Sequence, residues 1–345
     1  MRSWTTIAAL VAALAFVAAG CGGDDDEAGG TTTAATTEQA PALKVGLITD
    51  LGQLDDDGFN ELAYKGLQRA ERELGIDGRV VESRSAADYV PNMTSLVRQG
   101  YDLIIGVGFA QGDAVNTAAT RFPDIDFAIV DVDQATLKDK PDNVQGLLFK
   151  EQEVGYLAGY LAALAAKRDG AESVSAVGGF KEPPVDRFIA GYRAGAQKAV
   201  PGTKVTWSYS SDWDDQAKCK ELALNQIADG SGVVFQVAGG CGLGALNAAK
   251  EKDVWGVGVD ADQSFLGQHV LTSALKGVDE AVFQTIKATR DGTFQGGRNG
   301  VFGLDRNGVG LGTISPRANE EDVAKVERVR EQLANGEIGS IPTKL

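Results

Sequence analysis

The chain has 345 residues, 48 of them acidic and 33 basic, and a formal net charge of −15. This acidic excess argues against nucleic acid or an anionic lipid surface as a partner, because both are anionic and call for a basic patch. The length is sufficient for two lobes of ordinary domain size.

Residues 1–20 have the layout of a secretory signal peptide, with one basic residue near the start and an apolar core from Ile7 to Val17. The core is too short for a membrane span, which needs about 20 apolar residues. It ends in AAGC at residues 18–21, which resembles a bacterial lipobox and predicts that Cys21 becomes the lipidated N-terminus. Ordinary signal cleavage that leaves Cys21 free is the alternative.

Residues 21–42 contain no aromatic or large aliphatic side chain. A segment of this kind has nothing to bury in a core, so we expect a disordered tether. The folded part is then expected to run from Leu43 to Leu345. A lipidated Cys21 followed by this tether predicts a protein held on the extracytoplasmic face of the cell membrane.

Between residues 43 and 149, short apolar runs rich in β-branched residues alternate with amphipathic segments. The apolar runs are typical of strands buried on both faces, and the amphipathic segments are typical of the helices that cover them. This alternation predicts an α/β lobe built on a parallel sheet. The expected strands are 43–50, 78–83, 101–108, 126–131 and 143–149, and the expected helices are 58–75, 89–100 and 112–123.

A second series follows the segment EQEVGYLAGYLAALAAKRDG at 151–170 and repeats the pattern without obvious sequence repetition. Two doubly wound lobes in one chain leave a cleft between them, and in such sheets ligands bind at the carboxyl ends of the strands. The expected strands are 172–179, 203–210, 232–240 and 253–260, and the expected helices are 187–199 and 215–230.

Several residues suited to ligand binding follow the ends of these expected strands. Asp50, Asp131 and Asp260 each close a strand, and Trp213 comes shortly after another. Gly108 ends the strand at 101–108, where a ligand can approach the backbone closely. These are the positions that a binding cleft would use, although each carboxylate could instead cap a helix.

The loop after the first expected strand is rich in carboxylates, with a run of three from Asp55 to Asp57. Helix capping accounts for most of this run, because Asp before a helix accepts hydrogen bonds from its free N–H groups. The loop lacks the alternating oxygen ligands and the distal Glu of a calcium loop. A magnesium site is harder to exclude, but no phosphate-binding loop accompanies it. We therefore expect no metal site.

Enzyme motifs are largely missing from the sequence. His269 is the only histidine, so any histidine-based triad or zinc site would depend on it. The stretch with Gly240, Gly242 and Gly244, followed by Asp260, resembles half of a dinucleotide-binding fingerprint, but its spacing is G-x-G-x-G instead of G-x-G-x-x-G. We favour the alternative that these glycines form a tight turn in the cleft wall, and we expect no cofactor.

Two cysteines, Cys219 and Cys241, remain in the folded part. An even pair in an exported chain is typical of one disulfide. Two unpaired buried thiols are the alternative.

A set of segments occurs in order over nearly all of residues 43–280: VGLITDLGQLDDDGFNELAYKGL, YDLIIGVGF, PDIDFAIVD, LLFKEQEVGYLAGYLAA, VGGFKEPPVDRFIAGYRAG, VVFQVAGGCGLG, GVGVDADQ and VLTSALKGVD. In these segments the folded part resembles the basic membrane protein family of substrate-binding lipoproteins, whose members include purine-nucleoside receptors of ABC importers. The resemblance implies a type I periplasmic-binding-protein fold, with two Rossmann-like lobes joined by three crossovers and a ligand cleft that closes by a hinge. It further implies an N-terminal lobe of 43–149 plus about 271–312 and a C-terminal lobe of 150–270 plus about 313–345.

For the base of a nucleoside, the resemblance implies stacking between Phe59 and Trp213, where the family usually has Phe in place of Trp213. Asp50, Asn60 and Asp131 correspond to polar groups near the base edge. Asp133 lies so close to Asp131 in the sequence that either carboxylate could face the ligand.

For the ribose, the resemblance implies a pair formed by Asp260 and Lys276. A carboxylate accepts hydrogen bonds from the ribose diol and an ammonium donates to its oxygens. The alternatives are that Lys276 is a solvated surface charge and that Phe59 is a core residue at the start of a helix.

The sequence and the resemblance together predict a monomeric receptor that delivers a nucleoside, with a purine favoured, to an ABC permease in the membrane. The protein is not expected to be an enzyme. A receptor for another flat or sugar-like ligand, such as riboflavin or a sugar, is one alternative. An exported nucleoside-processing enzyme, with Asp50 and neighbouring carboxylates on a metal, is another. Whether binding serves transport or switches a sensor is left open.

Overall fold

The computed structural model describes residues 41–52 and 54–345. The expected signal peptide, Cys21 and the tether up to residue 40 lie outside the described residues. Within the part that is described, no helix combines the length and the apolar composition that crossing a membrane requires.

The first lobe is built on a parallel sheet with the strand order β11-β5-β4-β3-β1-β2. Leu47 of β1 packs in the core with α1 and α8, whereas the next residue, Ile48, packs with α2 and α3. Successive strand side chains point to opposite faces, so continuous apolar runs require helices on both faces. The elements are β1 (Lys44–Ile48), α1 (Phe59–Leu74), β2 (Asp77–Val81), η1 (Ala86–Asp88), α2 (Tyr89–Arg98), β3 (Leu103–Gly106), η2 (Phe109–Gln111), α3 (Gly112–Arg121), β4 (Asp126–Val130), η3 (Gln134–Thr136), β5 (Val144–Phe149), α8 (Val278–Arg290) and β11 (Arg298–Phe302).

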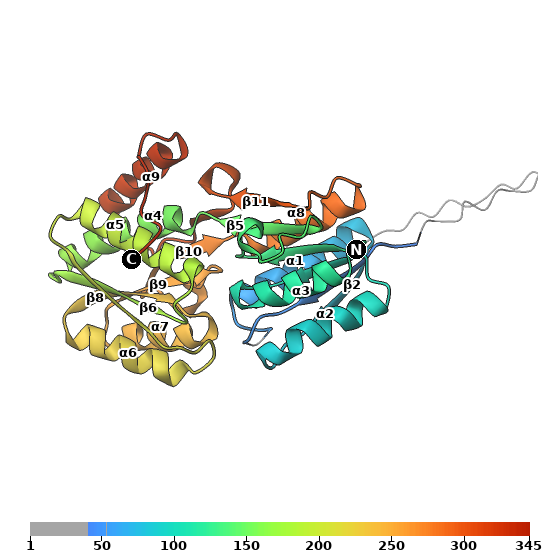
Figure 1. Cartoon of the computed structure of the whole chain (residues 1–345). Coiled ribbons are helices and arrows are strands. Elements are labelled where there is room, and N and C mark those ends of the chain that lie inside the picture. Colours follow the sequence, from blue (N-terminus) through green and yellow to red (C-terminus); the bar gives the residue numbers. More distant parts are fainter. Residues whose placement is uncertain (1–40, 53) are drawn as a thin grey trace, which may run out of the picture. The chain divides into compact units, whose positions relative to one another are not determined.

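The second lobe repeats this plan around a sheet with the order β12-β10-β9-β8-β6-β7 (Figure 1). Its strands pair in parallel, except that β12 is antiparallel to β10. The elements are α4 (Glu151–Arg168), β6 (Ser173–Gly178), α5 (Pro183–Ala199), β7 (Lys204–Tyr209), α6 (Gln216–Ala228), β8 (Ser231–Val237), α7 (Gly239–Glu251), β9 (Trp255–Asp260), η4 (Ser264–Leu266), β10 (Val270–Lys276), η5 (Leu304–Arg306), β12 (Val309–Leu311) and α9 (Glu320–Ala334).

The chain crosses from one sheet to the other after β5, after β10 and after β11. Both β10 and β12 belong to the second sheet, so the expected return to the first lobe at about 271–312 is wrong at both ends. The part that returns is α8, which packs against α1, and β11, which pairs with β5. An apolar run such as VLTSALK suits an internal strand of either sheet, and only its pairing with β9 decides the lobe.

Helices α4 and α5 pack at unusually close range because small residues face each other. A β-carbon at Gly159 would lie 1.9 Å from the carbonyl oxygen of Tyr192, and one at Gly195 would lie 1.9 Å from that of Tyr156. Any side chain at these positions would therefore push the helices apart. The close packing brings the first turn of α4 and the first half of α5 together, next to the ligand cavity described below.

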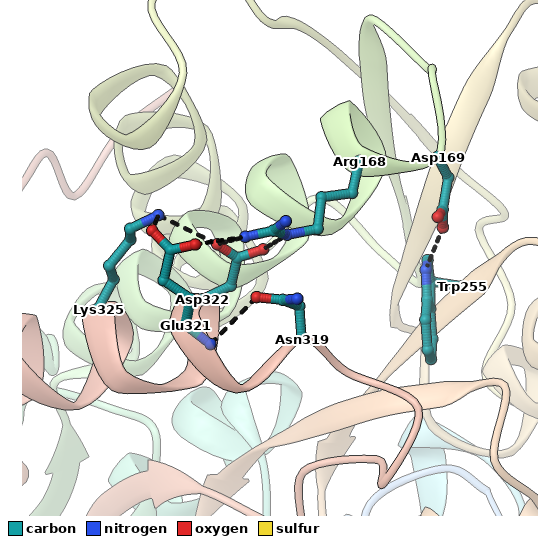
Figure 2. A network of polar contacts seen from close by, with 7 residues as sticks. All are labelled: Arg168, Asp169, Trp255, Asn319, Glu321, Asp322 and Lys325. Atoms are coloured by element: carbon teal, nitrogen blue, oxygen red, sulfur yellow. Dashed lines mark hydrogen bonds and ion pairs between the residues drawn. The ribbon is translucent and has the colours of Figure 1, made fainter.

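Helix α9 is held to the second lobe by a cluster of charges (Figure 2). Arg168 at the end of α4 pairs with Glu321 and Asp322 in the first turn of α9. Lys325, one turn later, lies 3.0 Å from Glu321 and 3.3 Å from Asp322. The cluster joins the C-terminal helix to an element more than 150 residues earlier in the chain.

Cys219 and Cys241 form a disulfide, with their Cα atoms 5.6 Å apart. The bridge joins α6 to the first turn of α7, and both cysteines are buried. The backbone N–H of Cys241 also donates to the carbonyl oxygen of Trp213 at 2.7 Å. The bridge therefore stabilises the start of α7 and the Trp213 loop together.

Replacing both cysteines with alanine is expected to lower the free energy of unfolding by about 3 kcal/mol, because the unfolded chain loses a cross-link between residues 22 apart. Urea denaturation of the oxidised wild type and the double variant measures this difference. The wild type with a reducing agent serves as the control and should approach the variant. Equal unfolding midpoints for the oxidised wild type and the double variant would contradict the prediction.

Candidate functional site

A cavity that is open to solvent at its mouth is lined by residues of both lobes. Small-molecule sites are commonly concave clefts of this kind. The cavity lies at the carboxyl ends of strands in both sheets, where doubly wound folds bind ligands. Every ligand-binding residue named from the sequence lines it: Asp50, Phe59, Asn60, Asp131, Trp213, Gly240, Asp260 and Lys276.

Asp50 is fixed at the end of β1 by several hydrogen bonds. Its Oδ1 accepts from the Tyr89 hydroxyl at 2.6 Å and from the backbone N–H of Leu51 at 2.7 Å, and its own N–H donates to Asn60 Oδ1 at 3.1 Å. Gly108 has a φ of +106°, and a β-carbon there would lie 2.0 Å from Asp50 Oδ2, so only glycine fits. Burial raises the pKa of Asp50 to about 6, although the bonds from Tyr89 and Leu51 oppose the rise.

Asp56, in the acidic loop, caps the start of α1. Its carboxylate accepts hydrogen bonds from the backbone N–H groups of Gly58, Asn60 and Glu61 at 2.9, 2.9 and 3.2 Å. The capping interpretation of the loop is thus confirmed for Asp56. The cap fixes the first turn of α1, so Phe59 packs partly on the core while it lines the cavity.

Asp131 directly follows β4, and Asp260 is the last residue of β9. The two strands hold corresponding positions in the strand orders of their sheets. The φ angles of the two aspartates are +71° and +62°, in the left-handed region that residues other than glycine seldom adopt. Such conformations persist where the surrounding structure imposes them, often at functional sites. Asp133 does not line the cavity, because its carboxylate accepts from the N–H of Ala135 and from Asn299 Nδ2.

Lys276 ends β10 and is only 2% exposed, so the interpretation as a solvated surface charge is wrong. Its Nζ lies 2.7 Å from Asp131 Oδ2 and 3.2 Å from Glu151 Oε1, and 5.0 Å from the centre of the Phe59 ring. No hydrogen bond or ion pair joins Lys276 to Asp260 among the described contacts, and their joint binding of a ribose stays a prediction. Burial alone would lower the pKa of Lys276, but the attraction of Asp131 and Glu151 outweighs it and raises the pKa.

Glu151, Arg187, Glu182, Phe109 and Phe188 belong to this region but were missed by sequence reasoning. Glu151 binds Arg187 through both oxygens, at 2.6 and 3.2 Å. The other three line the cavity. A glutamate in the first turn of a helix normally complements the helix dipole, so no local pattern indicates that Glu151 contacts a residue of the cavity.

Trp213 comes from the loop between β7 and α6, in the lobe opposite Phe59. Its ring packs over Gly179, where a β-carbon would lie 2.1 Å from Trp213 Cζ3. The ring of Phe180 lies 5.3 Å away at a tilt of 50°. These contacts fix a large apolar face in the cavity wall.

The glycines near the start of α7 have different roles. Gly239 and Gly240 line the cavity. A β-carbon at Gly242 or Gly244 would come within 1.8 or 1.9 Å of an oxygen of the protein itself, from Gln236 and Gln216 respectively. Gly240, Gly242 and Gly244 all lie within α7, so the tight-turn interpretation is wrong, and Gly242 and Gly244 are needed for internal packing of this helix.

A family model described as "ABC transporter substrate-binding protein PnrA-like" matches residues 43–344. The chain belongs to this Bmp family. It is 35% identical over 324 residues to a protein of Lactococcus lactis subsp. cremoris named ABC transporter nucleoside-binding protein BmpA, covering 88% of this chain and 90% of that one. It is 34% identical over 284 residues to a lipoprotein of Pyrococcus horikoshii, covering 79% and 69%.

Among solved structures, an ABC transporter solute-binding protein from Aeropyrum pernix superposes with a TM-score of 0.78 at 30% identity. The match covers 87% of this chain and 94% of that protein. The expected type I periplasmic-binding-protein fold is thus confirmed. As a member of the Bmp family, the chain is an ABC transporter substrate-binding protein, with a small-molecule ligand and a permease as its partners.

The cavity of this Bmp-family member is strongly acidic. Burial raises the pKa of Asp260 to about 7, and Lys276 only partly opposes the rise. Burial, with repulsion from Asp50 and Asp131, raises the pKa of Glu182 to about 7. The only basic residue that the described part of the chain contributes to the lining is Lys276, whereas the acidic residues in the lining are Asp50, Asp56, Asp131, Glu182, Asp214 and Asp260. This excess of carboxylates disfavours the binding of anionic ligands such as phosphate esters.

Stability of the ligand-free protein is expected to fall as the pH rises from 5 to 8. The pKa of Asp260 is about 7 in the folded state and 3.8 for a free carboxyl, so the folded state binds more protons in between and loses that advantage as the pH passes 7. Each pKa unit corresponds to about 1.4 kcal/mol, so the two units between pH 5 and 7 set an upper limit of about 3 kcal/mol for the loss that this group causes in the measured range.

Urea denaturation of the wild type and the Asp260→Asn variant at both pH values measures the contribution of Asp260. The variant should lose less stability between pH 5 and 8. Asp262→Asn is the matched control: burial would raise the pKa of Asp262, but hydrogen bonds from Thr313 and Ser264 outweigh it and lower the pKa, so Asp262 stays ionised from pH 5 to 8 and its replacement should leave the pH slope of the wild type unchanged. Parallel pH curves for the wild type and Asp260→Asn would contradict the assignment.

Proposed function

We propose that this substrate-binding protein is the extracytoplasmic receptor of an ABC importer for a nucleoside, with a purine as the base, and that it acts as a monomer without catalysis. The observation that carries the proposal is the composition of the cavity. Aromatic side chains from both lobes, Phe59 and Trp213, line the same space as Asp131 and Asp260, whose carboxylates keep acceptor oxygens that receive no hydrogen bond from the described residues. The name of the Lactococcus relative supports a nucleoside as the ligand.

The base would stack on Phe59 and Trp213. A purine has apolar faces and a polar rim, and stacking on an aromatic side chain contributes about 1–3 kcal/mol per base. Near the rim, Asn60 uses its Oδ1 for the N–H of Asp50, which leaves its Nδ2 as the group able to donate to a ring nitrogen or carbonyl oxygen. Asp50 supplies acceptor oxygens for ring or exocyclic N–H groups.

The ribose would bind Asp260 with help from Lys276 and Asp131. Asp260 is half-buried, and no donor to its carboxylate is found in the described part of the chain. Asp131 Oδ1 is fully buried without a hydrogen-bond partner in the described structure. Buried acceptors without partners are costly, and the hydroxyl groups of a ribose diol are donors that would satisfy them.

Calorimetric titration with adenosine, guanosine and inosine, together with mass spectrometry of any ligand that co-purifies, tests the proposal. We expect binding of at least one purine nucleoside and its recovery unchanged after prolonged incubation. Free base released from inosine would identify an enzyme instead. Binding of riboflavin or a sugar without binding of any nucleoside would reject the ligand assignment and retain the receptor.

We also propose that Cys21 carries lipid and holds the receptor on the extracytoplasmic face of the cell membrane. Support comes from the AAGC sequence at 18–21 and from the Pyrococcus relative that is named a lipoprotein. Cys21→Ser should move the protein from the membrane fraction to the soluble extracytoplasmic fraction. A variant that stays in the membrane fraction after salt and carbonate washing would show that Cys21 is not the anchor.

A further inference from the structure

Glu151 is a fully buried carboxylate at the start of α4 that does not line the cavity. Its Oε1 lies 3.2 Å from Lys276 Nζ, and its Oε2 accepts from Arg187 Nε at 2.6 Å. Burying a charge is costly unless it is paired and hydrogen-bonded. Glu151 meets this condition through two cations, and only one of them, Lys276, reaches the cavity.

Lys276 has three N–H donors and two carboxylate partners. It donates a hydrogen bond to Asp131 Oδ2 at 2.7 Å, and its Nζ forms an ion pair with Glu151 Oε1 at 3.2 Å. The side of the ammonium that faces neither carboxylate is left for the cavity that Lys276 lines. The orientation of the ammonium is set by its two carboxylate partners.

Asp260 is the acceptor that competes for the same ammonium. It lines the same cavity, interacts electrostatically with Lys276, and receives no hydrogen bond from another described residue. Without Glu151, the ammonium would gain by turning towards Asp260, because two carboxylates would then share it. The oxygens of Asp260 would be occupied by the protein itself.

We propose that Glu151 is a positioning residue for the sugar half of the site: it holds the Lys276 ammonium against Asp131 and away from Asp260, so that the Asp260 oxygens stay available to the ribose hydroxyls. The inference rests on the proposed nucleoside function. Arg187 completes the arrangement, because its bidentate contact fixes the carboxylate of Glu151.

The contact between Glu151 and Lys276 is internal to the second lobe, since α4, α5, β9 and β10 all belong to it. Asp131, in contrast, comes from the first lobe. Of the two carboxylates that orient the ammonium, Glu151 is therefore the one supplied by the same lobe as Lys276 and Asp260. This arrangement prepares the sugar half of the site independently of how the lobes close.

A purely structural role of Glu151, as a pair that joins α4 to α5, predicts a different response to mutation. Structural damage would weaken the binding of every ligand alike. Loss of positioning would weaken the binding of a nucleoside but leave the binding of the free base unchanged, because the base has no diol for Asp260. The matched control is Glu153→Gln, because Glu153 lies in the same helical turn and contacts Lys150 and the N–H of Leu304 instead of Lys276.

The experiment measures the affinities of guanosine and guanine, inosine and hypoxanthine, and adenosine and adenine by calorimetry for the wild type, Glu151→Gln and Glu153→Gln. Glu151→Gln should weaken nucleoside binding about tenfold, the loss of one hydrogen bond to a charged group, and leave free-base binding unchanged. Reductive methylation of the ligand-free protein, followed by peptide mapping, should label Lys276 about tenfold faster in this variant. Glu153→Gln should match the wild type in both measurements.

Equal losses for nucleoside and free base would overturn the proposal, as would wild-type affinity together with an unchanged labelling rate of Lys276. If the wild type binds none of the nucleosides, the proposed function fails, and the labelling rate alone decides whether Glu151 positions Lys276. If Glu151→Gln does not yield folded protein, Glu151→Asp replaces it, since it keeps the charge and shortens the reach by one methylene group.

Discussion

Replacing Lys276 with methionine is expected to lower the free energy of unfolding of the ligand-free protein by about 3–5 kcal/mol. The ammonium is 2% exposed and lies between Asp131 and Glu151, which are themselves buried. Its removal leaves Asp131 as a buried charge without a cation, whereas Glu151 keeps Arg187. The loss arises mainly from the desolvation of the carboxylate left behind and only in part from the contact removed.

Urea denaturation at neutral pH measures this loss of stability, and two further variants serve as controls. Lys150→Met removes an exposed ion pair with Glu153 and should cost less than about 1 kcal/mol. Adding Asp131→Asn to Lys276→Met removes the unpaired charge and should restore most of the stability. The prediction is contradicted if Lys276→Met is as stable as Lys150→Met. It is also contradicted if the double variant is no more stable than Lys276→Met alone.

Substitutions in the two halves of the cavity are expected to separate the base from the sugar. Trp213→Ala removes stacking area, so it should weaken nucleoside and free base together by about 1–3 kcal/mol, or about 5- to 150-fold. Asp260→Ala removes acceptors of the ribose hydroxyls, so it should cost more than about 1.5 kcal/mol for the nucleoside and much less for the free base.

Titration calorimetry with a free base, its nucleoside and the 2′,3′-dideoxynucleoside measures both effects. Phe265→Ala is a suitable control for the tryptophan, because Phe265 is 62% exposed and lies outside the cavity lining. A wild-type protein that binds guanine as tightly as guanosine would refute the role of Asp260. A Trp213→Ala variant that binds every flat ligand normally would refute the stacking.

The sequence by itself determined the layers of the fold and the rim of the cavity. Alternating apolar runs and amphipathic segments dictate a parallel sheet with helices on both faces, because side-chain direction repeats every 2 residues in a strand and every 3.6 in a helix. Asp50, Asp131 and Asp260 were found for the same reason. The carboxyl ends of parallel strands meet at one edge, so a residue at a strand end has a known place before any contact is known.

Tertiary structure alone decided which sheet each late strand joins and which charges pair. No local sequence feature marks β10 as a strand of the second sheet, because an apolar strand suits either lobe. Its pairing with β9 places it in the second sheet. The partners of Lys276 lie 145 and 125 residues away in sequence, at Asp131 and Glu151, and the nearer strand-end carboxylate, Asp260, does not pair with it. Periodicity is a local property of the chain, whereas the partner of a buried charge depends on how distant segments pack, and only the folded chain brings those segments together.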